Sequence, residues 1–342
     1  MGAVQNDFTR AAGIEVPLIC GAMYPCSNPE LVAAVSEAGG LGIIQPISLT
    51  YVHGHDFREG LRYIRTLTSR PVGVNVILES SSRLYLDRMR RYVDASLEEG
   101  VRFFVSSLGN PRWLCDVVHA AGGVVYHDVV SRKWALKALE GGVDGLIAVN
   151  DRAGGHAGHL SPLRMLDELR ELGVPLLLAG GVGDERGFVD ALRMGYAGVQ
   201  LGTRFIATTE CNAPAAYKQA LIDAVEDDVV LSERITGVPV AVLNTPHVQR
   251  MGTRAGPVAR WMLRGRRTKH WMRSIYALRS LVQLKRSVKG GGSGATSADY
   301  WQAGKSVAGI AAIEPAGEIV RRYARAAADA AVLTGSPASA GG

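Results

Sequence analysis

Residues 174–202, VPLLLAGGVGDERGFVDALRMGYAGVQLG, contain the repeating unit from which the fold class is predicted. An apolar run ends in two glycines, a helical pattern follows, and a further glycine precedes the next apolar run. Both runs are apolar throughout instead of alternating with polar residues, which is typical of strands covered on both faces in a parallel sheet. The unit therefore predicts an α/β fold built from strand–helix–strand repeats.

The same rhythm continues outward on the N-terminal side and covers residues 16–206. Eight apolar runs are found, at Pro17–Ala22, Leu41–Gln45, Val72–Ile77, Phe103–Ser106, Val124–Asp128, Gly145–Val149, Pro175–Ala179 and Gly198–Leu201. Helical patterns separate them, at Pro29–Ala38, Phe57–Leu67, Leu84–Glu99, Pro111–Ala121, Ser131–Glu140, Pro162–Leu172 and Glu185–Met194. Eight such strands alternating with helices predict a (β/α)8 TIM barrel. An open doubly wound sheet is the alternative, but the first run leads into Gly21-Ala22-Met23, which is not a Gly-x-Gly-x-x-Gly turn.

Capping residues mark the ends of several predicted helices. Asn28 and Ser161 precede Pro29 and Pro162, so we expect both side chains to cap a helix N-terminus. Glycines expected in the left-handed conformation follow six helices, at Gly39, Gly100, Gly122, Gly141, Gly173 and Gly195.

The rest of the chain is expected to form a second part. Residues 1–225 are assigned to the barrel, which ends in a helix at Pro214–Ala224, and residues 226–332 to an appended C-terminal helical lobe. Within this lobe we expect an extended segment around Val238-Pro239-Val240 and a last helix at Ser306–Ala331. Residues 290–294 are predicted to be a flexible tether and residues 333–342 a disordered tail.

Composition excludes several classes of protein. The chain has 342 residues, 47% of them hydrophobic and 20% charged, which is ordinary for a globular enzyme. No apolar leader and no membrane-length apolar run is visible, and the four cysteines lack metal-ligand spacing. These features predict a cytoplasmic protein with reduced thiols and no metal.

Positive charge is concentrated in the segment 250–289, which holds 12 Lys or Arg residues. One interpretation is a helical lobe with solvated basic flanks. The alternatives are contact with an anionic carrier, such as a coenzyme A or acyl-carrier thioester, or with an anionic membrane surface. Nucleic acid is not expected, because no recognised binding module accompanies the charge. A homodimer is left open.

Glycines and two histidines follow the last three predicted strands. In such a barrel the reacting groups lie at the carboxyl ends of the strands, and the loops after strands seven and eight typically bind phosphate. Here these loops contain Gly180-Gly181 and Gly202-Thr203, which predict a phosphate cradle. After strand six, a glycine pair precedes His156, which we expect to be the catalytic acid or base. The role of the nearby His159 is left open.

These residues also carry a resemblance to a known family. Five motifs occur in order at predicted strand ends: Gly21-Ala22-Met23, Gly73-Val74-Asn75, Ala153-Gly154-Gly155-His156, Gly180-Gly181 and Gly202-Thr203-Arg204-Phe205. Together they resemble the nitronate monooxygenase (2-nitropropane dioxygenase-like) family, over residues 8 to about 210, and the resemblance resumes weakly at Trp301-Gln302-Ala303-Gly304. The family combines an FMN-binding (β/α)8 barrel with an appended helical lobe.

The resemblance implies a cofactor site and a reaction. Expected cofactor-binding residues are Ala22, Met23 and Asn75 at the ring and ribityl region, with Gly154, Gly155, Gly180, Gly181, Gly202 and Thr203 at the ribityl chain and phosphate. Asp128 stands where some relatives carry a lysine, so a carboxylate would change the charge beside the ring. His156 would be catalytic in the oxidation of alkyl nitronates by O2. The alternatives are an NAD(P)H-dependent FMN reductase of quinones or enoyl thioesters, and a flavin-binding protein without turnover.

Overall fold

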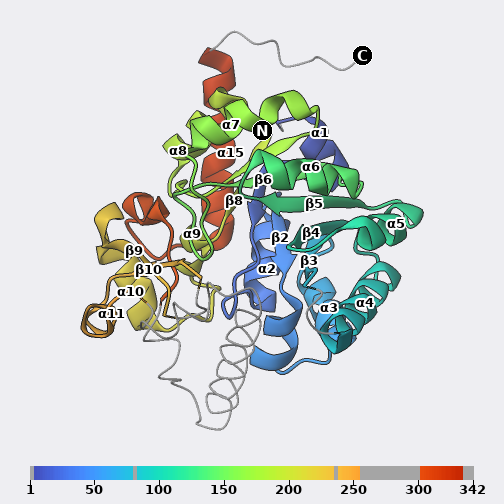
Figure 1. The fold of residues 1–342 in the computed structure, drawn as a ribbon, viewed down its shortest axis with the longest axis horizontal. Helices are drawn as coiled ribbons and strands as arrows, with labels where there is room; N and C mark the ends of the chain where they lie inside the picture. Colours follow the sequence, from blue (N-terminus) through green and yellow to red (C-terminus); the bar gives the residue numbers. More distant parts are fainter. Residues whose placement is uncertain (1–3, 80–82, 235–237, 255–300, 334–342) are drawn as a thin grey trace.

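Eight parallel strands close into a barrel in sequence order (Figure 1). The structure, a computed structural model, describes residues 4–79, 83–234, 238–254 and 301–333. The strands are β1 (Leu18–Cys20), β2 (Leu41–Ile44), β3 (Val72–Ile77), β4 (Phe103–Ser107), β5 (Val124–Val129), β6 (Gly145–Val149), β7 (Leu176–Ala179) and β8 (Gly198–Leu201). The helices that follow β1 to β7 are α2 (Pro29–Glu37), α3 (Phe57–Leu67), α4 (Arg83–Glu98), α5 (Arg112–Ala120), α6 (Arg132–Glu140), α7 (Pro162–Leu169) and α8 (Glu185–Met194). The predicted TIM barrel is therefore confirmed.

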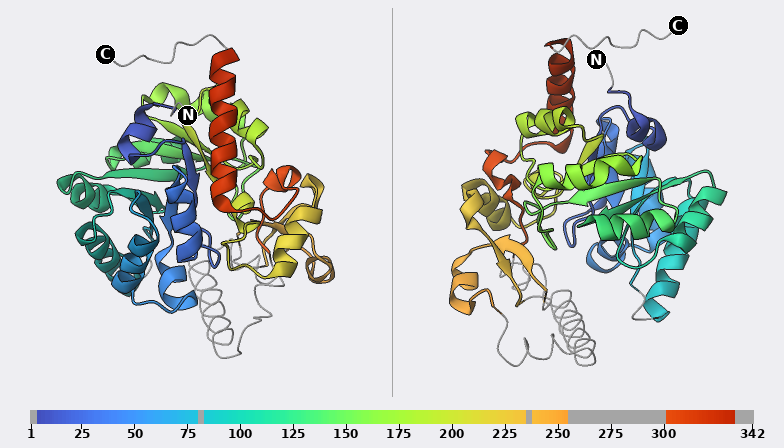
Figure 2. Two further views of the ribbon diagram at one scale, coloured as in Figure 1. Left: turned by 180° about the vertical axis from the view of Figure 1, so that it is seen from behind. Right: turned by 45° about the horizontal axis from the view of Figure 1, so that its top comes forward.

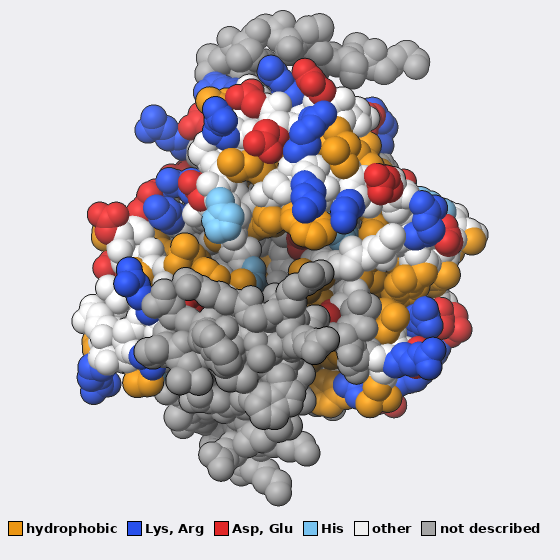
Figure 3. All heavy atoms as spheres, viewed as in Figure 1, with side chains coloured by type: hydrophobic (Ala, Val, Ile, Leu, Met, Phe, Trp, Pro, Cys, Tyr) orange, Lys and Arg blue, Asp and Glu red, His pale blue; other side chains and the backbone are white. Residues whose placement is uncertain are grey.

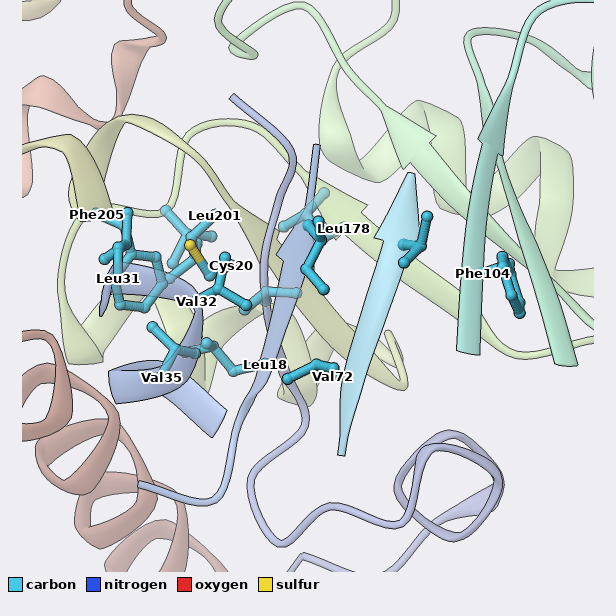
Figure 4. Packing of buried hydrophobic residues seen from close by; sticks show 14 of the residues in the cluster. Leu18, Cys20, Leu31, Val32, Val35, Val72, Phe104, Leu178, Leu201 and Phe205 are labelled. Carbon is cyan, nitrogen blue, oxygen red and sulfur yellow. The ribbon is translucent and has the colours of Figure 1, made fainter. Parts of the chain in front are cut away.

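The strands are largely apolar on both faces, as suits strands that are buried on both faces. The outward face packs against the helix layer, and Figure 4 shows Leu18 and Cys20 of β1 lying with Leu31, Val32 and Val35 of α2. The other face fills the barrel interior. Burying one large aliphatic side chain stabilises the fold by about 1.5–3 kcal/mol, so continuous apolar runs are favoured at these positions.

The barrel interior is closed at its amino end by α1 (Asp7–Ala12). Phe8 of this helix packs against the rings of Phe103 and Tyr126, with centroids 6.0 and 5.6 Å away. Above them lies a layer of buried aliphatic side chains from several strands, including Ile19 and Ile147. The interior is therefore a filled core, and the end that remains for a site is the carboxyl end of the strands.

The last helix occupies a position that the sequence pattern did not reveal. After β8 come α9 (Thr203–Ile206), α10 (Ala215–Asp223), the antiparallel pair β9 (Val229–Ser232) and β10 (Val240–Leu243), α11 (Pro246–Met251) and α15 (Ala316–Leu333). α15 packs against both α8 and α2, as two views in Figure 2 show. It thus closes the outer ring between the seventh and the first barrel helix, as the partner helix of β8.

Several details differ from the prediction. The helix expected from Ser306 begins at Ala316, after a 3-10 turn at Lys305–Gly309. The described residues after the barrel include β9 and β10, so this region is not purely helical. The division into domains at residue 225 stays a prediction. The predictions for residues 255–300 and 334–342 lie outside the described residues, and with them the tether, most of the basic segment and nearly all of the tail.

Two of the predicted caps are wrong. Asn28 makes no capping hydrogen bond; its amide instead donates to the Glu30 carboxylate and the Glu210 carbonyl. Gly141 has a φ of −79°, and the left-handed position is taken by the next residue, Gly142, with a φ of 92°. Ser161 does cap its helix, accepting from the Arg164 backbone N–H. Among the helices described, none combines the length and apolarity needed to cross a membrane.

Candidate active site

The loop after β6 is fastened to the loop after β7 by Asn150. This side chain is fully buried, and its amide Nδ2 donates to the Gly180 carbonyl at 3.0 Å. Its Oδ1 accepts from the Arg152 backbone N–H at 2.7 Å. Asn150 was not among the predicted site residues, although a polar residue directly after a buried strand was a usable signal.

Gly180 and Gly181 are required where these two loops meet. Their φ angles are 114° and 86°, which L side chains rarely adopt. A Cβ on Gly180 would lie 2.5 Å from the Ala153 backbone nitrogen, and one on Gly181 would lie 2.6 Å from Arg152 Nε. The two glycines therefore allow bare backbone to line the mouth of the barrel beside the loop after β6.

The loops after β1 and β8 lie against each other on the adjoining side of the mouth. A Cβ on Gly202 would lie 3.5 Å from Met23 Sδ, which places the predicted ring-contacting and phosphate-binding loops together. Ala22 and Met23 are half-buried, whereas Thr203 is buried. The Thr203 hydroxyl accepts from the Gly304 backbone N–H at 2.9 Å, so the loop after β8 also touches a segment far along the chain.

That segment, residues 301–304, and β10 hold the loop that carries His156. The Ala241 N–H donates to the Gly155 carbonyl at 2.7 Å, and the Ala303 N–H donates to the Ala241 carbonyl at 3.2 Å. A Cβ on Gly154 would lie 2.9 Å from the Gly304 nitrogen. Gly154 is thus needed for close backbone contact with the part of the chain that follows the barrel, and Gly155, with a φ of 69°, for the left-handed backbone beside it.

His156 follows this backbone bridge directly. Its side chain is exposed, yet desolvation by the protein around the imidazole lowers its pKa. The neutral ring is therefore favoured at neutral pH, and a neutral imidazole can accept a proton from a ligand. His159, three residues later, is also exposed.

The floor of the barrel mouth is polar. Three polar side chains point inward here, as their pairing with residues of the interior core shows. The pairs are Asn75 with Val105, Asp128 with Ile147 and Gln200 with Ile19. Gln200 Nε2 donates to Asp128 Oδ1 at 3.4 Å, and Asn75 Nδ2 to the Val105 carbonyl at 3.4 Å. Burial raises the pKa of Asp128 to about 7, partly offset by the hydrogen bond from Gln200.

Gln200 was missing from the predicted site. It is the polar member of the apolar run of β8, at a position with interior parity, and this was the signal that could have revealed it. Its Oε1 is buried and has no hydrogen-bond partner among the residues that the structure describes. Because a buried acceptor without a partner is costly, the floor is suited to a ligand that brings a donor.

The residues present fit a flavin. Glycine loops with bare backbone suit a phosphate and a ribityl chain, and the unpartnered Gln200 oxygen suits an N–H of a ring lying over the mouth. The face drawn in Figure 3 is hollowed near its centre, where hydrophobic, acidic and histidine side chains meet. The structure brings all the predicted residues to this end of the barrel; which of them touch a cofactor stays a prediction.

The chain is similar in sequence to several known proteins. The sequence matches the family model described as nitronate monooxygenase over residues 6–325. It is 32% identical to the (3aS,4S,5R,7aS)-5-hydroxy-7a-methyl-1-oxo-octahydro-1H-indene-4-carboxyl-CoA dehydrogenase of Rhodococcus jostii, covering 72% of this chain and 67% of that protein. It is 26% identical to a probable nitronate monooxygenase of Staphylococcus aureus, covering 74% of this chain and 82% of that protein.

Two solved structures are similar over nearly the whole chain. FabK from Thermotoga maritima matches with a TM-score of 0.74 at 28% sequence identity, covering 97% of this chain and 98% of that chain. A nitroalkane oxidase from Streptomyces ansochromogenes matches with a TM-score of 0.74 at 24% identity, covering 95% of this chain and 99% of that chain. At this identity the second likeness shows the fold alone.

Proposed function

The chain belongs to the nitronate monooxygenase family of flavin-dependent oxidoreductases, and we propose that it binds FMN and oxidises alkyl nitronates with O2. The observation that carries the proposal is the arrangement at the barrel mouth. There, Asn150 joins the loop of His156 to Gly180, and the loops after β1 and β8 lie against each other beside it. A flavin supplies the electron transfer when bound, and the protein supplies position and charge.

The proposed binding roles follow from the backbone. Gly180, Gly181 and Gly202 leave main-chain groups accessible to a phosphate, and Thr203 adds a hydroxyl. We assign the cofactor as FMN, with one terminal phosphate, because the glycine loops follow the paired strands β7 and β8 and can together receive one phosphate. The polar floor of Asn75, Asp128 and Gln200 would lie beneath the ring.

His156 is proposed to handle the proton. The lowered pKa keeps its imidazole neutral near pH 7, so the ring can accept a proton from a carbon next to a nitro group or hydrogen-bond a nitronate oxygen. The hydrogen bond from the Ala241 N–H to the Gly155 carbonyl holds the backbone directly before His156, from which the imidazole projects. A neutral base that the loop holds in place is what a proton transfer at a small acidic substrate needs.

The reaction of an acyl-CoA thioester is the second candidate. It is favoured by the identity of 32% to a CoA dehydrogenase, which exceeds the 26% to the probable nitronate monooxygenase. The imidazole of His156 would serve equally here, because the α-carbon of a thioester is also acidic. The basic segment 250–289, for which contact with an anionic carrier is one alternative, lies outside the described residues beyond Arg254.

One anaerobic experiment separates these candidates. The purified protein, loaded with FMN, is mixed with propyl-2-nitronate, with NADH, or with a saturated acyl-CoA, and the flavin absorbance is followed. We expect bleaching by the nitronate and reoxidation when O2 is admitted. Bleaching by NADH or the acyl-CoA with no response to the nitronate would overturn the nitronate assignment, and failure to take up FMN would overturn the proposed function itself.

A further inference from the structure

Asp128 occupies an unusual position for a carboxyl group. It ends the interior face of β5, where Tyr126, two residues earlier, belongs to the hydrophobic core of the barrel. Its register partner on β6 is Ile147 of the same core. The carboxyl is thus the point at which the apolar interior meets the open mouth.

The groups around Asp128 carry no compensating charge. From across the barrel, β8 contributes Gln200, whose amide donates to the carboxyl at 3.4 Å. On β5 itself, His127 bonds Ser106 at 2.8 Å, and burial lowers its pKa to about 4, while burial raises the pKa of Tyr126. Both neighbours are therefore neutral near pH 7. Within the described residues, burial and Gln200 account for the shift in the pKa of Asp128.

We propose that Asp128, held by Gln200, is the specificity-determining residue that sets the charge beneath the flavin ring and so controls access of anionic substrates. The inference rests on the proposed function, since it needs a flavin over the mouth. A neutral carboxyl can donate a hydrogen bond to a neighbouring anion, whereas a carboxylate repels that anion. The same charge opposes the negative charge that a flavin gains on reduction.

The raised pKa of Asp128 determines how the KM for an anionic substrate and the flavin midpoint potential should change with pH. Below about pH 7 the carboxyl is protonated and an anionic substrate meets a neutral floor. As the pH rises through about 7, a negative charge appears, so the KM for an anionic substrate should rise and the flavin midpoint potential should fall. The hydrogen bond from Gln200 favours the ionised form, so removing it should move this transition to higher pH.

The test uses the FMN-loaded full chain and Asp128→Asn, which keeps the shape of the side chain without the charge. KM for propyl-2-nitronate and the flavin midpoint potential are measured between about pH 6 and pH 8.5. We expect the wild-type KM to rise about tenfold relative to the variant across this range, the equivalent of one pKa unit, with kcat less affected. The wild-type potential should fall more steeply with pH than that of the variant.

Two further variants sharpen the result. Gln200→Leu should shift the transition to higher pH, and Asp151→Asn, which removes an exposed carboxylate from the loop after β6, should leave the wild-type profile unchanged. The inference is overturned when Asp128→Asn binds FMN and shows the wild-type dependence of KM and potential on pH. A wild-type chain that takes up no FMN overturns the proposed function instead, so the two failures are distinct.

Discussion

At the scale of the residue, the position of His156 follows from the backbone on its N-terminal side. Gly154 and Gly155 allow that backbone to approach Gly304 and Ala241 closely, and Gly155 is in the left-handed conformation with a φ of 69°. A side chain on Gly154 would collide with the backbone at Gly304, and a side chain on Gly155 would be strained by the left-handed backbone there. Gly154 and Gly155 therefore determine the position of the backbone from which the His156 side chain projects.

Replacing His156 tests its role directly. His156→Asn removes the proton acceptor while leaving the glycine pair intact, so FMN binding should stay near normal and kcat should fall by about two to four orders of magnitude. Stopped-flow measurement of flavin reduction by 2-nitropropane, the neutral nitroalkane whose α-carbon still carries the proton, gives the rate. His159→Asn is the matched control. Equal rates for the wild type and His156→Asn would remove this histidine from the mechanism.

Gly180 gives a second prediction at this scale. Gly180→Ala places a Cβ against the Ala153 backbone nitrogen in a backbone conformation that alanine rarely adopts. The loops after β6 and β7 must separate, and we expect FMN affinity to fall at least tenfold, measured by fluorescence titration. Gly173→Ala is a useful control for φ alone, since it has a φ of 75° and no atom within 4 Å of its Cβ position. Equal losses in both variants would mean that strain, not the loop contact, weakens binding.

At the scale of the element, α15 is held by buried contacts with the barrel. Tyr323 is fully buried and stacks on Phe188 of α8, with ring centroids 5.3 Å apart. At the start of the helix, Glu314 pairs with the buried Arg204 and with Arg322. These contacts join α15 to α8, which follows β7, and to α9, which follows β8. The last helix therefore contributes to the stability of the barrel.

The hydroxyl of Tyr323 allows a prediction about the free energy of unfolding. It is buried and has no hydrogen-bond partner in the described part of the chain. Tyr323→Phe removes this unpaired group and keeps the ring, so the free energy of unfolding should stay the same or increase by about 1 kcal/mol. Tyr323→Ala should lower it by about 3–5 kcal/mol through the cavity it creates. Chemical denaturation measures both values, and a large loss in Tyr323→Phe would reveal a hidden partner for the hydroxyl.

At the scale of the whole molecule, the barrel is completed by a helix that lies more than a hundred residues beyond its strand. β8 ends at Leu201 and α15 begins at Ala316. The intervening chain contributes β10 and residues 301–304, which contact the loops after β6 and β8. The candidate site and the closure of the barrel therefore depend on the same returning segment.

A truncated chain tests this dependence. A protein ending at Ile313 lacks α15 and leaves the faces of α2 and α8 that it covers without a partner. Ile319, Val320 and Tyr323 are each fully buried, and losing such burial costs about 1.5–3 kcal/mol per side chain, against a total stability of about 5–15 kcal/mol. We expect an insoluble or unfolded product, judged by solubility and circular dichroism. A soluble, FMN-binding product with the thermal transition of the full chain would show that α15 is dispensable.

Local patterns in the sequence predict the strands, most of the barrel helices and the loops of the candidate site. β3, β6, β8, α3 and α8 have the predicted bounds, because apolar runs, helical periodicity and glycine positions are local signals. The remaining features arise only in the folded chain, through contacts between residues that are distant in the sequence. Gln200 meets Asp128 across 72 positions, and Gly304 meets Thr203 across 101. Such pairs leave no periodic trace in the chain, because they depend on how the closed barrel brings strand ends and the returning segment to one place.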